Sequence, residues 1–213
     1  MKEKRMDVEE AIRRRRSVRQ YTKDPVSATE IREMLSLASQ APSISNRQMW
    51  RFVVVTDPTL RGFLADMVAR RIDEMATWYE FENNPRRIEA LKKQALHFRH
   101  APVVIFLVNL GYRSPLNEAL VTRGMKLWEA DRLFGYPDIQ SISAVTAYLT
   151  LLADARGYAT CWMTEPLLAK KDLQASLELK SGEEIVALLT MGKSAESLSY
   201  RNRRPIDEII EWR

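Results

Sequence analysis

Two short polar segments near the beginning of the chain carry the side chains best suited to bind a charged or strongly hydrogen-bonding ligand. The first is Arg15-Arg16-Ser17-Val18-Arg19, which sets three guanidinium groups and one hydroxyl on five consecutive residues. Guanidinium groups this close repel one another unless an anion lies among them. The second is Ala41–Trp50, a polar turn that runs directly into the apolar segment Trp50–Val55. We therefore expect an anionic ligand at the first segment and a ligand rich in hydrogen-bonding atoms at the second.

The composition describes an ordinary globular protein and excludes several other classes. The chain has 213 residues, 29% of them charged and 46% hydrophobic, which is typical of one large soluble domain. Its longest apolar run, Pro102–Val108, is far too short to span a bilayer, and the basic N-terminus lacks the apolar stretch of a secretory signal. The net charge of +5 is spread over short basic groups, without a recognisable nucleic-acid-binding module. We expect a cytoplasmic protein that binds neither nucleic acid nor a membrane.

The sequence gives little support to metal chemistry or to a side-chain nucleophile. A single cysteine, Cys161, excludes an internal disulfide, and two histidines are too few for an ordinary cysteine–histidine zinc site. His97 and His100 lie three residues apart on an expected helix, but no third ligand accompanies them. The chain has no GxGxxG, phosphate-loop, GxSxG or HExxH motif. These absences predict no catalytic side chain and no metal, and they favour a bound organic cofactor.

The hydrophobic pattern alternates helices with short strands, which predicts an α+β domain whose sheet is flanked by helices. The capping box Ser27-Ala28-Thr29-Glu30 precedes a helix whose apolar residues share one face. The segment 101–110 is continuously apolar, so its strand should be buried on both faces. Gly157 is expected to end a long, central and buried helix. The expected strands are Trp50–Thr56, Ala101–Leu110, Ala159–Met163 and Ile185–Met191, and the expected helices include Glu118–Phe134, Ile139–Ala155 and Leu167–Leu177.

Together with the sequence further along the chain, the two polar segments resemble the FMN-dependent nitroreductase family. In that family the first basic motif reads R-x-S-x-R/K, and Arg15, Ser17 and Arg19 occupy its positions here, with Arg16 inside the same motif. The resemblance implies that Arg15 and Ser17 bind the phosphate and ribityl end of FMN. It implies that Arg19 approaches N1 and O2 of the flavin, where a fixed cation stabilises the reduced anion. Without the resemblance, these residues fit a solvated basic helix end equally well.

The turn before the first strand resembles a second family motif, P-S-x-x-N followed by Q-x-W, with Met49 in place of the usual proline. The resemblance implies that this turn reaches into the FMN site of the partner subunit. An ordinary helix-to-strand turn with Trp50 in the core is the alternative. The residues of the turn expected to contact FMN are Pro42, Ser43, Ile44, Asn46 and Gln48.

A third segment, Gly157–Thr164, resembles the family strand that runs beside the isoalloxazine ring. The resemblance implies that Trp162, Met163 and Thr164 lie near the dimethylbenzene edge and N5 of the flavin. Glu165-Pro166 departs from the glycine with which many members continue. Thr164 is equally suited to cap the helix that follows, a common role for threonine.

The end of the chain is expected to serve both the cofactor and a dimer. The segment Arg201–Pro205 matches the place where the family sets basic residues on the phosphate, which implies that Arg201 and Arg203 bind FMN. The resemblance also implies an intertwined homodimer built on a central, mostly antiparallel sheet flanked by helices. Residues 1–213 then form a single FMN-binding domain, and residues 193–213 are an extension that packs on the partner subunit.

The resemblance implies an FMN-dependent oxidoreductase with a ping-pong mechanism. NADH or NADPH would reduce the flavin, and an electron-poor acceptor, such as a nitroaromatic, a quinone or an enone, would then reoxidise it. An oxygen-using or dehalogenating flavoenzyme of the same family, a non-catalytic FMN-binding or storage protein, and a basic interaction protein without flavin remain as alternatives. Trp128, Phe134 and Tyr136 could line the acceptor pocket, although core packing explains them equally well.

Overall fold

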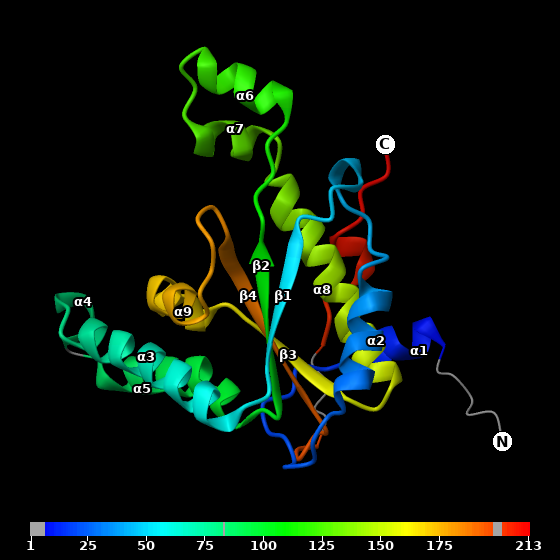
Figure 1. Ribbon diagram of the computed structural model, residues 1–213. Helices are drawn as coiled ribbons and strands as arrows, with labels where there is room; N and C mark the ends of the chain where they lie inside the picture. Colours follow the sequence, from blue (N-terminus) through cyan, green and yellow to red (C-terminus); the bar gives the residue numbers. More distant parts are fainter. Residues whose placement is uncertain (1–6, 83, 198–201) are drawn as a thin grey trace.

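A four-stranded antiparallel sheet lies at the centre of the fold (Figure 1). The computed structural model describes residues 7–82, 84–197 and 202–213. The strand order is β1-β2-β4-β3, so β1 and β3 form the two edges of the sheet. Helices cover both faces, which confirms the α+β fold expected from the sequence. The strands are β1 (Trp50–Val55), β2 (Val103–Asn109), β3 (Ala159–Met163) and β4 (Glu184–Gly192).

The helices form two layers, one on each face of the sheet (Figure 1). The first layer contains α3, α5 and α9, with the short α4 between α3 and α5. The second layer contains α2 and α8, and α1 packs beside α8. The helices are α1 (Val8–Arg14), α2 (Ala28–Ala38), α3 (Pro58–Ala76), α4 (Tyr79–Glu82), α5 (Pro85–Leu96), α6 (Pro115–Thr122), α7 (Leu127–Leu133), α8 (Pro137–Ala155) and α9 (Lys170–Ser176). Four short 3-10 helices are η1 (Ile44–Asn46), η2 (His97–His100), η3 (Glu165–Ala169) and η4 (Ile206–Glu208).

Strand β2 divides the hydrophobic core into two halves. Every residue of this strand is buried, as its continuous apolar sequence predicts. Because side chains alternate along a strand, Val104, Phe106 and Val108 face the layer of α3 and α9. Ile105 and Leu107 face the layer of α2 and α8. The sheet is therefore held between two apolar layers.

The ends of the helices follow from the signals seen in the sequence. At the start of α2, Ser27 Oγ accepts from the Glu30 backbone N–H at 3.1 Å, which is one half of the expected capping box. The Glu30 carboxylate accepts from the Ser27 hydroxyl at 3.0 Å. At the end of α8, Gly157 takes the left-handed φ of +77° that ends the helix. Helix α8 covers the sheet with one face only, because Tyr148 on its other face is exposed. The expectation that α8 is buried on nearly every face is therefore wrong.

The expected single helix Glu118–Phe134 is also wrong, because the structure divides this region into α6 and α7. Gly124 stands at the break with a φ of +95°, which a residue inside a helix cannot adopt. The two helices form an arm that projects away from the sheet (Figure 1). The side chains of Leu127 and Trp128 are exposed.

The helix expected at Leu167–Leu177 begins earlier and is divided into η3 and α9. Pro166 lies in the first turn of η3, where its missing N–H has no cost. Glu178, with a φ of +51°, follows the last turn of α9. The chain after β3 thus turns at once into a helical segment, which places Glu165 beside the end of the strand.

Gly192 marks a close approach between β4 and two neighbouring segments. A Cβ at this position would lie 2.7 Å from Cδ of Pro102 and 3.0 Å from Cδ1 of Tyr21. We expect Gly192→Ala to lower the free energy of unfolding by about 1–3 kcal/mol, because this crowding forces the backbone apart. Gly62→Ala in α3 is the matched control, since its Cβ would meet nothing within 4 Å and should stabilise the helix. Urea unfolding of both variants tests this, and equal stabilities for Gly192→Ala and wild type would contradict it.

Candidate functional site

An ion pair at the end of α1 fixes the start of the arginine segment. The Arg14 guanidinium donates to the Asp154 carboxylate at 3.0 Å and to the Asp154 backbone carbonyl at 2.6 Å. Asp154 lies in the last turn of α8 and is buried. The pair therefore ties α1 to α8 and sets the direction in which the chain leaves α1 for the sheet.

The segment Arg15–Arg19 runs along the free edge of β3. The Val18 N–H donates to the Thr160 carbonyl at 3.0 Å, and Ser17 pairs with Thr160 as a parallel bridge. Alternate side chains of an extended chain share a side, and here Val18 is buried whereas Ser17 and Arg19 are exposed. The spacing R-x-S-x-R thus places Ser17 and Arg19 on one outer side, while Arg15, at the C-cap of α1, is half-buried.

The loop after β4 closes the other side of this segment. Tyr21 forms an antiparallel bridge with Ser194. The Glu196 carboxylate accepts from the backbone N–H groups of Arg19 at 2.6 Å and of Gln20 at 3.2 Å. This carboxylate fixes the backbone beneath the motif, so that the arginine segment, β3 and the loop after β4 form one unit.

Arg15 and Arg19 belong to the segment that runs along the outer edge of β3. Within the described ranges, the guanidinium group of neither residue pairs with a carboxylate. Burial raises the pKa of the Cys161 thiol, and the positive charges of Arg19 and Arg15 oppose that rise. Arg16 is directed elsewhere, because its guanidinium donates to the backbone carbonyls of Arg13 and Arg15 at 2.7 Å each, at the end of α1.

The turn between α2 and β1 holds three non-glycine residues with a left-handed backbone. Ser45, Asn46 and Gln48 have φ values of +48°, +52° and +47°. Side chains maintain this shape, because Ser43 Oγ accepts from the Gln48 N–H at 3.0 Å and Asn46 Oδ1 accepts from Gln48 Nε2 at 3.1 Å. Such strained residues cluster at ligand sites, where surrounding contacts over-determine them.

This turn does not meet the arginine segment within one chain. Figure 1 places Pro42–Gln48 at one end of α2 and Arg15–Arg19 toward the other end. Helix α2 has 11 residues, and at about 1.5 Å per residue it separates the two segments by roughly 16 Å. The turn rests instead on α8, where the Ile44 N–H donates to Ser141 Oγ at 3.2 Å. The structure therefore brings together the first and third motifs of the sequence and leaves the second apart.

The end of β3 presents one aromatic ring and one hydroxyl to the outside. Trp162 is 39% exposed, whereas Met163 is buried in the core below α3 and α9. Thr164 is exposed and stands at the N-cap of η3, but its side chain makes no capping hydrogen bond. Its backbone N–H donates to the Glu165 carboxylate at 3.3 Å. The Thr164 hydroxyl has no partner among the described residues, so the helix-capping role is not observed.

The basic tail is described only in part. Arg201 lies outside the described residues, and Arg203 is exposed. The neighbouring Arg204 is engaged within the tail, where its guanidinium donates to the Glu208 backbone carbonyl at 3.1 Å. The first residues of the expected extension, Lys193–Glu196, pair with Arg19–Thr22 of the same chain. The later residues 206–212 expose several large apolar side chains.

Glu196, whose carboxylate fixes the backbone of Arg19, gave no functional signal in the sequence. Glu196 follows Arg19 by 177 residues, so only the strand order could bring the two together. The described ranges contain no group of three histidine, cysteine or acidic side chains that could hold a metal ion. None of the described helices has the length and hydropathy needed to cross a bilayer.

The whole fold is shared with known flavoproteins and their relatives. The family described as "Nitroreductase family" matches residues 12–193. The chain is 29% identical over 210 residues to an NADH dehydrogenase of Thermus thermophilus, which covers 98% of this chain and 97% of the relative. It is 30% identical over 201 residues to a 5,6-dimethylbenzimidazole synthase of Rhodospirillum rubrum, covering 90% and 87%. A BluB-like flavoprotein from Clostridium difficile 630 superposes with a TM-score of 0.87 at 27% identity, over 97% of this chain and 99% of the other.

Proposed function

Since the chain belongs to the nitroreductase family of flavin oxidoreductases, we propose that it is a homodimeric FMN enzyme that uses NADH or NADPH to reduce a small electron-poor acceptor. The acceptor is a nitroaromatic, a quinone or an enone. It binds at the same open site as the nicotinamide, after the nicotinamide has left. The observation that carries the proposal is that Arg15 and Arg19, in the segment on the outer edge of β3, pair with no carboxylate among the described residues.

The residues at this edge fit FMN in charge and in shape. A phosphate dianion neutralises the mutual repulsion of the arginines, and guanidinium groups bind phosphate through charge-assisted hydrogen bonds. The exposed Ser17 hydroxyl lies on the same side. Trp162 and Thr164 supply an aromatic surface and a free hydroxyl at the far end of the strand. When bound, FMN supplies the hydride and one-electron chemistry that no side chain of this site provides.

We propose that each site is completed by two subunits. In one subunit Arg15, Ser17, Arg19 and the end of β3 hold the cofactor, with Arg201 and Arg203 near the phosphate. Arg16 adds positive charge from the end of α1. The strained turn, with Pro42, Ser43, Ile44, Asn46 and Gln48, then comes from the partner, because it lies about one helix length away within its own chain. Residues 202–213 of the extension pack on the partner subunit.

The roles of the protein groups follow from this arrangement. Arg19, near the pyrimidine side of the flavin, stabilises negative charge that develops there on reduction. Met163 packs below the strand and keeps its backbone in place, so that β3 serves as a fixed wall for the ring. No side chain is required as a general acid, because the proton can come from solvent. The same open face then admits the nicotinamide and the acceptor alternately.

We expect purified protein to show the absorbance of bound flavin and to lose it when NADH or NADPH is added without oxygen. A panel of nitroaromatics, quinones and enones should then restore the absorbance. Flavin that NADH and NADPH leave oxidised would identify a storage protein, and a colourless protein that binds no added FMN would favour the basic interaction protein.

A second candidate is an oxygen-using flavoenzyme, and the free hydroxyl of Thr164 is the observation that favours it. The similarity to a 5,6-dimethylbenzimidazole synthase and to a BluB-like flavoprotein adds support. Reoxidation by oxygen that is much faster than reoxidation by any member of the acceptor panel would distinguish this candidate. Halogenated aromatic compounds, added to the same panel, test for dehalogenation.

We expect Thr164→Ala to change the two one-electron reduction potentials of bound FMN if the hydroxyl lies near N5. A hydroxyl near N5 is expected to stabilise the one-electron-reduced flavin relative to the other two redox states. Its loss should therefore narrow the gap between the two one-electron potentials. Thr164→Ser keeps the hydroxyl and is the matched control. Spectroelectrochemical titration measures both potentials, and identical gaps in wild type and Thr164→Ala would place the hydroxyl away from N5.

A further inference from the structure

Among the described residues, one hydrogen bond joins the strained turn Pro42–Gln48 to another part of its own chain. The other hydrogen bonds of the turn connect its own residues, as Ser43 and Asn46 do with Gln48. The bond that leaves the turn runs from the Ile44 N–H to Ser141 Oγ, at 3.2 Å. Ser141 belongs to the first half of α8, and the start of this helix lies beside the turn (Figure 1).

Buried side chains give the turn little further support. Every side chain of the turn except that of Ser43 is exposed, and Ile44 is exposed to 39%. The buried residues Ala41 and Met49 flank the turn but do not belong to it. Three residues of the turn have a left-handed backbone, which costs free energy unless surrounding contacts maintain it. The position of the turn therefore depends strongly on its hydrogen bond to Ser141.

The Ser141 hydroxyl is itself held in one orientation. Ser141 is buried, and its Oγ donates to the Pro137 carbonyl at 2.6 Å, one helical turn earlier. A serine hydroxyl has one proton and two lone pairs, so this bond leaves Oγ able to accept from the Ile44 N–H. Thr146 on the same helix donates to the Ile142 carbonyl at 2.7 Å in the same way. Among the described residues, however, its hydroxyl makes no contact with the turn.

We propose that Ser141 is a positioning residue, whose hydroxyl fixes the strained turn and thereby sets the FMN affinity of the site that the turn completes in the partner subunit. This role rests on the proposed sharing of each FMN site between two subunits. Ser141 acts through the backbone of Ile44 and does not itself touch the cofactor. Without the hydroxyl, the turn loses its bond to α8, and its left-handed residues can relax to conformations that no longer fit FMN.

Replacement of Ser141 by alanine tests this role. In Ser141→Ala the Kd for FMN should rise about five- to tenfold, as expected for the loss of one hydrogen bond that orders a binding segment. The fold should survive, because alanine is the best helix former. Ser141→Thr keeps a hydroxyl able to form both bonds, and its Kd should stay within about twofold of the wild-type value.

Thr146→Val is the matched control, because it removes a hydroxyl that bonds to α8 alone. Its Kd for FMN should equal that of wild type. Hydrogen–deuterium exchange in the FMN-free protein supplies a second readout that is independent of activity. The Ile44 amide should exchange faster in Ser141→Ala than in wild type, and at the wild-type rate in Thr146→Val and Ser141→Thr.

A mixed dimer distinguishes an effect on the partner's site from a general weakening of the altered subunit. One subunit carries Ser141→Ala, and the other carries Arg15→Ala and Arg19→Ala. One site then combines the intact arginines of the first subunit with the intact turn of the second, so it should bind FMN with wild-type affinity. If Ser141 acts within its own subunit instead, this remaining site will be as weak as in the Ser141→Ala homodimer, which would overturn the proposal.

The outcomes also separate the role of Ser141 from the proposed function. Wild-type FMN affinity in the Ser141→Ala homodimer would overturn the positioning role and leave FMN binding intact. An equal loss of affinity in Thr146→Val would overturn it as well, because the effect would then belong to α8 as a whole. Wild-type protein that binds no FMN would contradict the proposed function itself.

Discussion

Replacing Arg15 and Arg19 together by alanine is expected to weaken FMN binding about 100-fold or more. Each guanidinium is proposed to form a charge-assisted hydrogen bond with the cofactor, and such bonds contribute about 1.5–3 kcal/mol each. Two such losses sum to at least about 3 kcal/mol, which corresponds to roughly two orders of magnitude in Kd. Titration of apo-protein with FMN, followed by the quenching of flavin fluorescence, measures the change.

The fold should survive this double substitution, because neither side chain pairs with a carboxylate within the described ranges. Arg13→Ala is the matched control. Arg13 lies in α1 just before the segment, but its guanidinium is exposed and pairs with Glu9 at 3.3 Å. A surface pair of this kind contributes at most about 1 kcal/mol to stability. An FMN affinity that falls equally in both variants would mean that net charge, and not the geometry of the motif, binds the cofactor.

Removal of residues 206–213 is expected to convert the proposed dimer into a monomer that no longer holds FMN. The tail exposes Ile206, Ile209 and Ile210 at 58%, 57% and 41%, and Trp212 at 90%. Exposed apolar side chains gathered in one short segment mark an interaction surface. If they bury themselves on the partner, their loss removes several kcal/mol of association free energy, at about 25 cal/mol per Å². Light scattering and the flavin content of the purified protein measure both effects.

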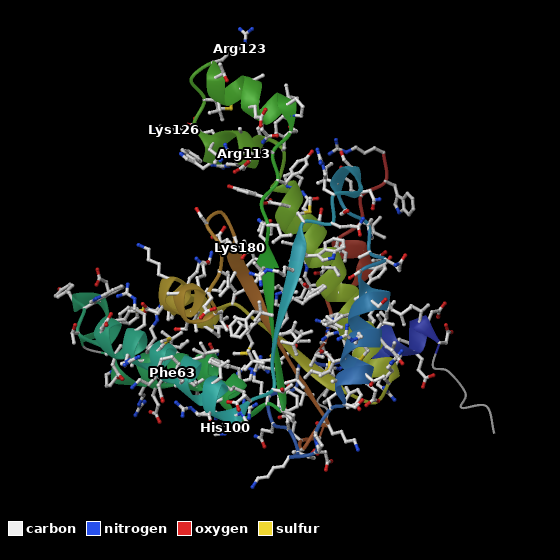
Figure 2. All side chains as sticks on the ribbon, in the orientation of Figure 1. Phe63, His100, Arg113, Arg123, Lys126 and Lys180 are labelled. Carbon is white, nitrogen blue, oxygen red and sulfur yellow. The ribbon has the colours of Figure 1, made fainter. Side chains whose placement is uncertain are left out.

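A full-length variant with Ile209→Ser and Trp212→Ser should show the same dissociation in weaker form. Phe63→Ser is the control, since Phe63 is 49% exposed and lies on α3, in the opposite helical layer (Figure 2). It should leave the mass unchanged. A truncated protein that keeps the mass of a dimer and a full complement of FMN would show that the tail does not join the subunits.

Local signals in the sequence predicted much of the secondary structure. Ser27 and Glu30 predicted the start of α2 because a capping box is formed by neighbouring residues alone. The run Val103–Val108 in β2 predicted a strand buried on both faces because its side chains are apolar on both sides of the sheet. The arm of α6 and α7 was predicted as one helix because a helical pattern continues on both sides of Gly124, whose φ of +95° a sequence does not reveal.

The arrangement of the candidate site could be predicted only in part. The spacing of Ser17 and Arg19 carries its own information, since alternation along an extended chain puts both on one side. The contact of Glu196 with Arg19 depends on the antiparallel position of the chain after β4, and no local pattern encodes it. The residues of local motifs can therefore be predicted from the sequence, whereas the residues that long-range packing brings beside them are identified from the structure.

The stoichiometry of FMN in a designed heterodimer tests most directly whether the site is shared between subunits. One subunit carries Arg15→Ala and Arg19→Ala, and the other carries Ser43→Ala and Asn46→Gly, where glycine keeps the left-handed backbone of the turn. With two different affinity tags the mixed dimer can be isolated. A shared site predicts one FMN per heterodimer at wild-type affinity, because one site combines the intact arginines with the intact turn. No site of wild-type affinity in the heterodimer would contradict the account, because each site would then lie within a single, damaged chain.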